Sequence, residues 1–148
     1  MNLEEDYKRG IDCGRLAAYL DRRGSVSIRR ITRKSGIYGY TLYLQVGSSK
    51  RELVEWLKAN FGGNASYEHM LKGGWSKKLY ERNVWNISGQ KAYELLVESR
   101  EFFIEEKERV ALAIEFWENT KGLYLKLRTK LKGHEQLEKE YWELFKSL

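Results

Sequence analysis

Residues 14–28, GRLAAYLDRRGSVSI, restrict the fold of this chain more than any other segment. Gly14, Ala17 and Ala18 are three and four positions apart, so on a helix they form one strip that has almost no side chain. The helical pattern ends near Asp21, and a glycine three residues later leads into the alternation typical of a strand. The segment therefore predicts a helix joined directly to a strand, with a strip that lets another helix approach closely.

The same segment resembles a known motif. Residues 16–21, LAAYLD, and then Gly24 resemble the LAGLIDADG motif of the homing-endonuclease family. FGG at residues 61–63, WNISG at residues 85–89 and ALAIEF at residues 111–116 extend the resemblance to roughly residues 11–119. The family's unit is αββαββα with a saddle-shaped antiparallel sheet. The chain has one motif, and single-motif members act as homodimers, so the resemblance implies a homodimer.

Hydrophobic periodicity gives the same α+β fold class, an αββαββα order followed by C-terminal helices. We expect helices over residues 4–20, from a cap at Ser48 or Ser49 to 60, and over 90–99, 105–119 and 134–145, with strands over 25–34, 38–46, through 67, and over 79–87. Residues 1–119 are expected to form the DNA-binding domain. Residues 120–148 are expected to be a helical extension packed on the same domain.

Positive charge is concentrated in the predicted strands and loops. The net charge is +6, and residues 25–50 and 69–80 contain basic residues and no acid. Basic strands interleaved with tyrosines suit a phosphate backbone better than a membrane surface. A single cysteine excludes an internal disulfide framework. No long apolar run and no signal segment is present, so we expect a cytoplasmic protein of prokaryotic or phage type without a membrane partner.

The catalytic positions of the family are changed in this chain. The resemblance places Arg23 where the motif has its metal-binding acid, and Glu106 where members often carry a lysine. Ser48 corresponds to a polar residue at the end of the second strand, and Asp21 to a structural residue at the helix end. A guanidinium does not ligate a divalent cation, so no metal or other cofactor is expected. One hypothesis pairs Arg23 with Glu106; the other is independent change after catalysis was lost.

The resemblance and the strand alternation together identify candidate site residues. In the family, the sheet lies in the major groove, and Arg29, Arg33 and Gln45 are our candidates for base contacts. The full set of expected DNA-binding residues is Ser27, Arg29, Ile31, Arg33, Lys34, Thr41, Tyr43, Gln45, Tyr67, His69, Lys72, Lys77, Lys78 and Arg82. The expected dimer interface is Gly14, Ala17, Ala18 and Asp21.

These observations favour a homodimer that binds a specific double-stranded DNA site without cutting it, which would suit a regulator. Two alternatives stay open. One is an active magnesium-dependent LAGLIDADG homing endonuclease with an atypical motif. The other is an RNA maturase, which would use the same scaffold and basic surface.

Overall fold

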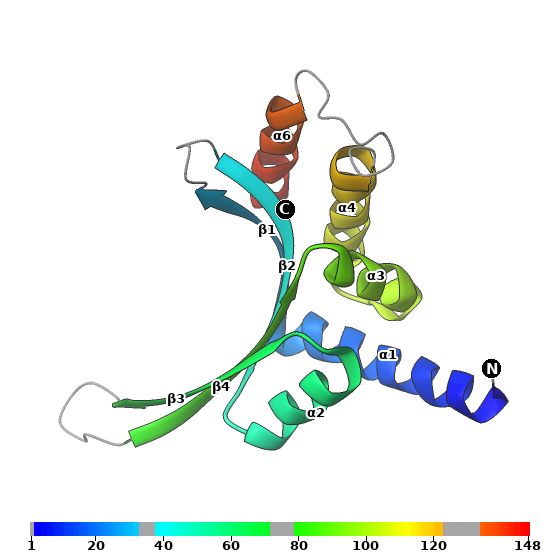
Figure 1. Ribbon diagram of the computed structural model, residues 1–148, viewed down its shortest axis with the longest axis vertical. Coiled ribbons are helices and arrows are strands. Elements are labelled where there is room, and N and C mark those ends of the chain that lie inside the picture. The colour runs from blue at the N-terminus through cyan, green and yellow to red at the C-terminus, as the bar shows by residue number, and fades with distance from the viewer. Residues whose placement is uncertain (1, 33–37, 72–78, 123–133) are drawn as a thin grey trace.

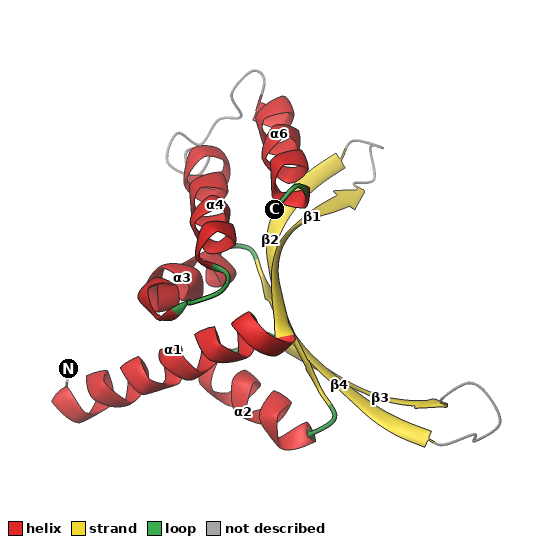
Figure 2. Cartoon of the chain, turned by 180° about the vertical axis from the view of Figure 1, so that it is seen from behind, coloured by secondary structure: helices red, strands yellow, loops and turns green. Residues whose placement is uncertain are grey.

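A curved four-stranded antiparallel sheet, with helices on one face only, defines the architecture (Figures 1 and 2). The computed structural model describes residues 2–32, 38–71, 79–122 and 134–148. In chain order the elements are α1 (Leu3–Arg23), β1 (Gly24–Thr32), β2 (Tyr38–Ser48), α2 (Arg51–Phe61), β3 (Asn64–Leu71), β4 (Leu79–Ser88), α3 (Gln90–Ser99), the 3₁₀ turn η1 (Arg100–Phe102), α4 (Lys107–Trp117), the π-helical turn η2 (Glu118–Gly122) and α6 (His134–Lys146). This is the expected αββαββα order with a further helix.

The first helix passes into the sheet without a loop. The side chain of Asn2 caps α1 by accepting the backbone N–H of Glu4 at 2.9 Å. The helix continues to Arg23, three residues past the expected end at Leu20, and β1 begins at the next residue. A Cβ at Gly24 would lie 2.6 Å from the backbone oxygen of Gln45 on β2. Glycine therefore allows the close contact between the end of α1 and the sheet.

The strand order β1-β2-β4-β3 places the two hairpins side by side, joined by the pairing of β2 with β4. Alternate residues of the strands face the helices and are buried, including Leu42, Leu44 and Val46 on β2 and Trp85 on β4. Burial of each such side chain stabilises the fold by roughly 1.5–3 kcal/mol. The core thus lies between one face of the sheet and the helix layer.

Two further expected helix boundaries are wrong. Ser48 is the last residue of β2, and the N-cap of α2 is Lys50, whose backbone N–H donates to Ser48 Oγ at 3.0 Å. The expected helix over residues 105–119 is shorter, since α4 ends at Trp117 and η2 follows. There, the Thr120 hydroxyl donates to the carbonyl of Phe116, and such bonding competes with the regular helical ladder.

The last helix packs on the same core. Phe145 of α6 is buried, and the Trp142 ring lies 5.8 Å from the ring of Tyr40 on β2. Lys121 in η2 forms an ion pair of 2.7 Å with Glu138, whose side chain is 3% exposed. These contacts attach α6 to the helix-covered face of β1 and β2 (Figure 1). Among the helices described, none has the length and apolar character needed to cross a membrane.

The turn between α2 and β3 provides a test of packing at the sheet. Gly62 and Gly63 both have positive φ, but a Cβ at Gly62 would meet open space, whereas one at Gly63 would collide with the backbone oxygen of Asn86. We expect Gly63→Ala to lower the free energy of unfolding by about 1–3 kcal/mol more than Gly62→Ala, because overpacking adds to the backbone strain that both share. Urea denaturation of both variants measures the difference. Equal losses would show that β3 can shift to accept the methyl group.

Candidate nucleic-acid interface

The concave face of the sheet carries no helix (Figures 1 and 2). Cross-strand partners share a face of an antiparallel sheet, so the strand register identifies which residues lie there. Within the described strands, the residues of this open face are Ser25, Ser27, Arg29 and Ile31 on β1, Gly39, Thr41, Tyr43, Gln45 and Gly47 on β2, Arg82, Val84, Asn86 and Ser88 on β4, and Asn64, Ser66 and Glu68 on β3. We call this set the open face. Most of its side chains are polar.

The Arg29 side chain on the open face stacks on the aromatic ring of Tyr43. The guanidinium carbon of Arg29 lies 3.5 Å from the centroid of the Tyr43 ring on the neighbouring strand. The Ser27 hydroxyl donates to the backbone oxygen of Tyr43 at 3.4 Å. Stacking restricts the rotamers of the arginine while its N–H groups stay available, so less entropy is lost when it binds a phosphate or a base.

The charge of the open face comes from few residues. Among its described members, Arg29 and Arg82 are cations and Glu68, the register partner of Arg82, is the acid. Five expected DNA contacts lie outside the described residues: Arg33, Lys34, Lys72, Lys77 and Lys78.

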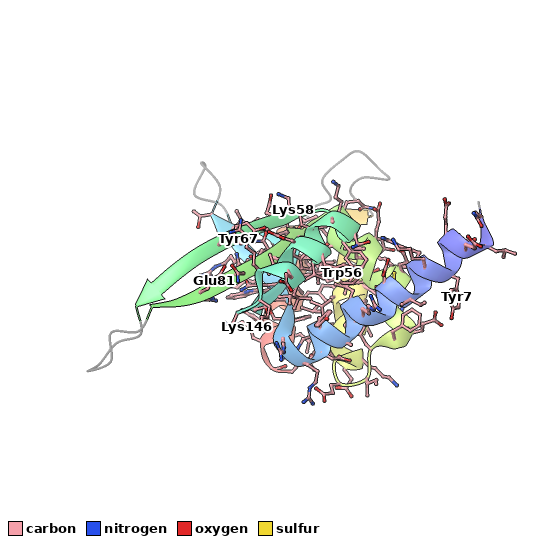
Figure 3. All side chains as sticks on the ribbon, turned by 90° about the horizontal axis from the view of Figure 1, so that it is seen from below. Tyr7, Trp56, Lys58, Tyr67, Glu81 and Lys146 are labelled. Carbon is pink, nitrogen blue, oxygen red and sulfur yellow. The ribbon has the colours of Figure 1, made fainter. Side chains whose placement is uncertain are left out.

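The expected placement of Tyr67 and His69 with Arg82 is wrong. Tyr67 pairs with Asn83 and His69 with Glu81, so both hold positions on the opposite side of the sheet from Arg82. Tyr67 lies beside α2, where the Arg51 guanidinium carbon is 4.0 Å from its ring centroid (Figure 3). A shift of one residue in register exchanges the two faces of a strand, and the sequence of this hairpin did not define its register.

The corrected register brings to the open face four uncharged polar residues that we did not expect there from the sequence. They are Asn64, Ser66, Asn86 and Ser88. A signal for them was present, because small polar residues alternate with Ala65 on β3 and with Trp85 and Ile87 on β4.

The expected dimer strip on α1 is only partly exposed. Ala17 is fully buried in the core, which corrects the expectation that it lies on an accessible seam. Gly14 is half-buried, and a Cβ there would lie 3.9 Å from the Phe102 ring. Ala18 is exposed. The helix thus uses one part of its small-residue strip for its own chain and leaves Ala18 accessible.

Asp21 fixes the end of α1 to the segment before α4. Its two carboxylate oxygens accept the backbone N–H groups of Ile104 at 2.9 Å and Glu106 at 3.0 Å. Ile104 and Glu106 lie between η1 and α4, and the Asp21 carboxylate supplies the hydrogen-bond acceptors for their backbone N–H groups. The placement agrees with a structural role for Asp21 at the helix end.

The fold agrees with that of several solved homing endonucleases. The archaeal intron-encoded homing endonuclease I-Vdi141I is 17% identical, with a TM-score of 0.64 over 97% of this chain and 84% of that chain. I-CvuI is 13% identical, with a TM-score of 0.63 over 94% of this chain and 84% of that chain. The LAGLIDADG homing endonuclease I-SmaMI is 18% identical, with a TM-score of 0.52, and the match covers 88% of this chain and 41% of that one.

The chain has the LAGLIDADG homing-endonuclease fold. No protein-family profile matches the sequence. No curated protein matches it either.

At the end of α1, the hypothesis that pairs Arg23 with Glu106 is wrong. Glu106 pairs instead with Arg109, whose Nε lies 3.0 Å from Glu106 Oε2. A weak, exposed pair of 3.5 Å joins the neighbouring residues Arg22 and Glu105. Arg23 is exposed and forms no ion pair or side-chain hydrogen bond within the described part of the chain.

The residues at this position of the LAGLIDADG fold do not fit a magnesium site. Arg23 is a cation, and both oxygens of Asp21 already accept amide N–H groups. Ser48 is buried on the helix-covered face, where its oxygens accept from the backbone of Lys50 and the side chain of Asn83. The described residues contain no group of three His, Cys, Asp or Glu side chains placed to hold a metal. Magnesium prefers carboxylate oxygens, and the carboxylate of Asp21 at this helix end is engaged by two backbone N–H groups.

Replacement of Asp21 tests the link between α1 and the segment before α4. Asp21→Asn keeps the shape of the side chain, but the amide has one acceptor oxygen where the carboxylate has two. Its NH₂ group would then face one of the two backbone N–H groups. We expect the free energy of unfolding to fall by about 1–3 kcal/mol, because one amide donor is left without its charged acceptor. Hydrogen exchange at the amides of Ile104 and Glu106 should accelerate.

The matched control is Glu115→Gln, which neutralises an exposed carboxylate on α4. Unchanged exchange at both amides in Asp21→Asn would contradict the structural role of this carboxylate.

Proposed function

We propose that the chain is a homodimeric protein that binds a specific site in double-stranded DNA and does not cleave it. The observation that carries the proposal is the open face: a concave, helix-free sheet surface with polar and basic side chains at alternate positions of all strands. Alternate side chains on such a ribbon suit contact with base edges in the major groove, which admits β-strands.

The solved proteins of similar fold support a DNA partner. I-Vdi141I was solved complexed with DNA, and I-CvuI in complex with its target. The identities are below 20%, so these complexes support the binding mode through the shared fold and not through shared contact residues.

The exposed side of α1 supports a second copy of the chain as partner. Leu3, Tyr7 and Ile11 are 86%, 74% and 43% exposed and are spaced four residues apart. Ala18 lies two turns after Ile11 on the same side of the helix, and the turn between them holds Gly14 and the exposed Arg15. The N-terminal half of α1, where Tyr7 lies, extends beyond the other helices (Figures 1 and 3). An apolar stripe on a protruding helix favours pairing with an equivalent helix across a two-fold axis.

The donor chemistry at the end of α1 supports the proposed absence of cleavage. Arg23 brings a fixed positive charge to a position where the family places a metal-binding acid. A guanidinium binds phosphate oxygens directly and does not activate water, so the protein gains affinity for the backbone without a nucleophile.

Selection of bound duplexes from a random library in EDTA, followed by addition of magnesium to the recovered complexes, tests the proposal. Enrichment of one two-fold-related site that stays intact with magnesium supports it. Cutting at that site would favour the endonuclease alternative. Failure to enrich a duplex, together with tighter binding of folded intron RNA, would favour the maturase alternative.

Arg29 is expected to be a major contact on the open face. Arg29→Ala should weaken binding of the selected site by about 1–3 kcal/mol and reduce the slope of log K against log salt by about 1. Fluorescence anisotropy over a salt series measures both quantities.

Arg51→Ala is the matched control, because Arg51 stacks on Tyr67 in the same way but on the helix-covered side of the sheet. An equal loss in both variants would point to general charge and not to the open face.

Ala18 is expected to lie near the two-fold axis. Ala18→Arg places two like charges at the proposed seam, so the mass measured by sedimentation equilibrium should fall from that of two chains to 17.5 kDa. Ala59→Arg, at an exposed position of α2, should leave the dimer intact. A dimer that tolerates Ala18→Arg would place the seam elsewhere.

A further inference from the structure

Three carboxamide side chains form a row across the middle of the open face. Gln45 on β2 pairs in register with Asn86 on β4, and Asn86 pairs with Asn64 on β3. Ser25 on β1, which pairs with Gln45, completes a row that crosses all strands of the sheet. Asn64 is exposed, and Gln45 and Asn86 are half-buried. The row thus lies where the two hairpins join.

These three are the carboxamides that have no hydrogen-bond partner of their own within the described residues. Every other Asn and Gln of the chain forms a side-chain hydrogen bond of 3.5 Å or less: Asn2 with Glu4, Asn60 with Trp56, Asn83 with Ser48, Gln90 with Trp117, Asn119 with Tyr141 and Gln136 with Glu140. Carboxamides elsewhere therefore stabilise the fold. Those of the row leave their donors and acceptors directed at no other described group.

The turn before β3 holds the row together. Gly63 has a φ of 86°, and the backbone oxygen of Asn86 occupies the space that a side chain at this position would need. The close approach brings Asn64, the next residue, beside Asn86 at the first position of β3. Adjacent strands are about 4.8 Å apart, so the row from Gln45 to Asn64 spans about 10 Å. This length fits a major groove that is about 12 Å wide.

Carboxamides match one base in particular. An Asn or Gln side chain can donate to N7 of adenine and accept from its N6 amino group in the same plane, a pairing that other bases do not offer in the major groove. The half-buried setting of Gln45 and Asn86 limits their rotamers, which favours a bidentate contact over a loose one.

We infer that Gln45, Asn86 and Asn64 form an adenine-recognition site, which fixes adenine-containing base pairs at one place in each half of the DNA target. The inference rests on the proposed function and adds the base that this part of the open face selects. Arg29, on the β1–β2 hairpin, contacts a different part of the same half-site.

The test compares the sites selected by the wild-type chain and by isosteric variants. Asn86→Asp and Gln45→Glu retain shape but replace the NH₂ donor with an acceptor, which matches the amino group of cytosine and not N7 of adenine. Asn86→Ala removes the contact without adding charge. Asn119→Asp, which changes a carboxamide bonded to Tyr141 away from the open face, is the control. Random duplexes are selected in EDTA, and base frequencies at each position are compared.

We expect wild type and Asn119→Asp to share an adenine at one pair of two-fold-related positions. In Asn86→Asp the preference for that adenine should fall by roughly 5- to 150-fold, with cytosine gaining, and in Asn86→Ala it should fall without a gain of cytosine. Thermal unfolding by circular dichroism, measured on the same preparations, identifies variants that bind poorly because they are unfolded. Asn64→Ala, at an exposed strand end, is a further variant for the same comparison.

Two results would overturn the inference in different ways. If wild type enriches a specific site and the folded row variants keep the same adenine preference, the row is not the adenine-recognition site, while the proposed function stands. If the folded wild type enriches no duplex, both the inference and the proposed function fail.

Discussion

The pairing of β2 with β4 is the constraint on which the rest of the structure depends. Residues Tyr43–Ser48 pair with Asn83–Ser88 and turn two hairpins into one sheet. On one side, this pairing brings Val46 and Trp85 together in the core; on the other, it brings Gln45 beside Asn86. Without it, the chain would have two small ribbons, and isolated ribbons of this size are marginally stable in water.

The end of α1 is joined to the segment that leads into α4. Asp21 ties the helix to the segment before α4, and Glu106 pairs with Arg109 on α4. These contacts make the helix end a structural joint. The exposed Arg23 beside it is then available for a partner with negative charge, and the proposed DNA backbone is such a partner.

The sequence was sufficient for the order of elements and for α3, whose boundaries agree with the expected ones. It was also sufficient for the faces of β1 and β2, because Val26 and Ile28 on β1 and Leu42, Leu44 and Val46 on β2 hold alternate positions. It was insufficient for the faces of β3 and β4. Tyr67, an aromatic residue that we expected on the DNA-binding face, pairs with Asn83 on the helix-covered side. Alternation defines two faces, but only tertiary contact determines which is buried. The ion pair of Glu106 with Arg109 spans three residues at the start of α4, so helical spacing in the sequence could have indicated it.

In each strand, the residues that hold the sheet on its helices and those that face outward alternate one by one. In β1, the residues that pack in the core therefore alternate with those available for recognition. Outward positions can change with little cost in stability, since surface substitutions usually alter it by less than about 0.5 kcal/mol. A protein built in this way can acquire a new target by single substitutions while its core stays constant, which gives evolution, or a designer, access to many sites from one scaffold.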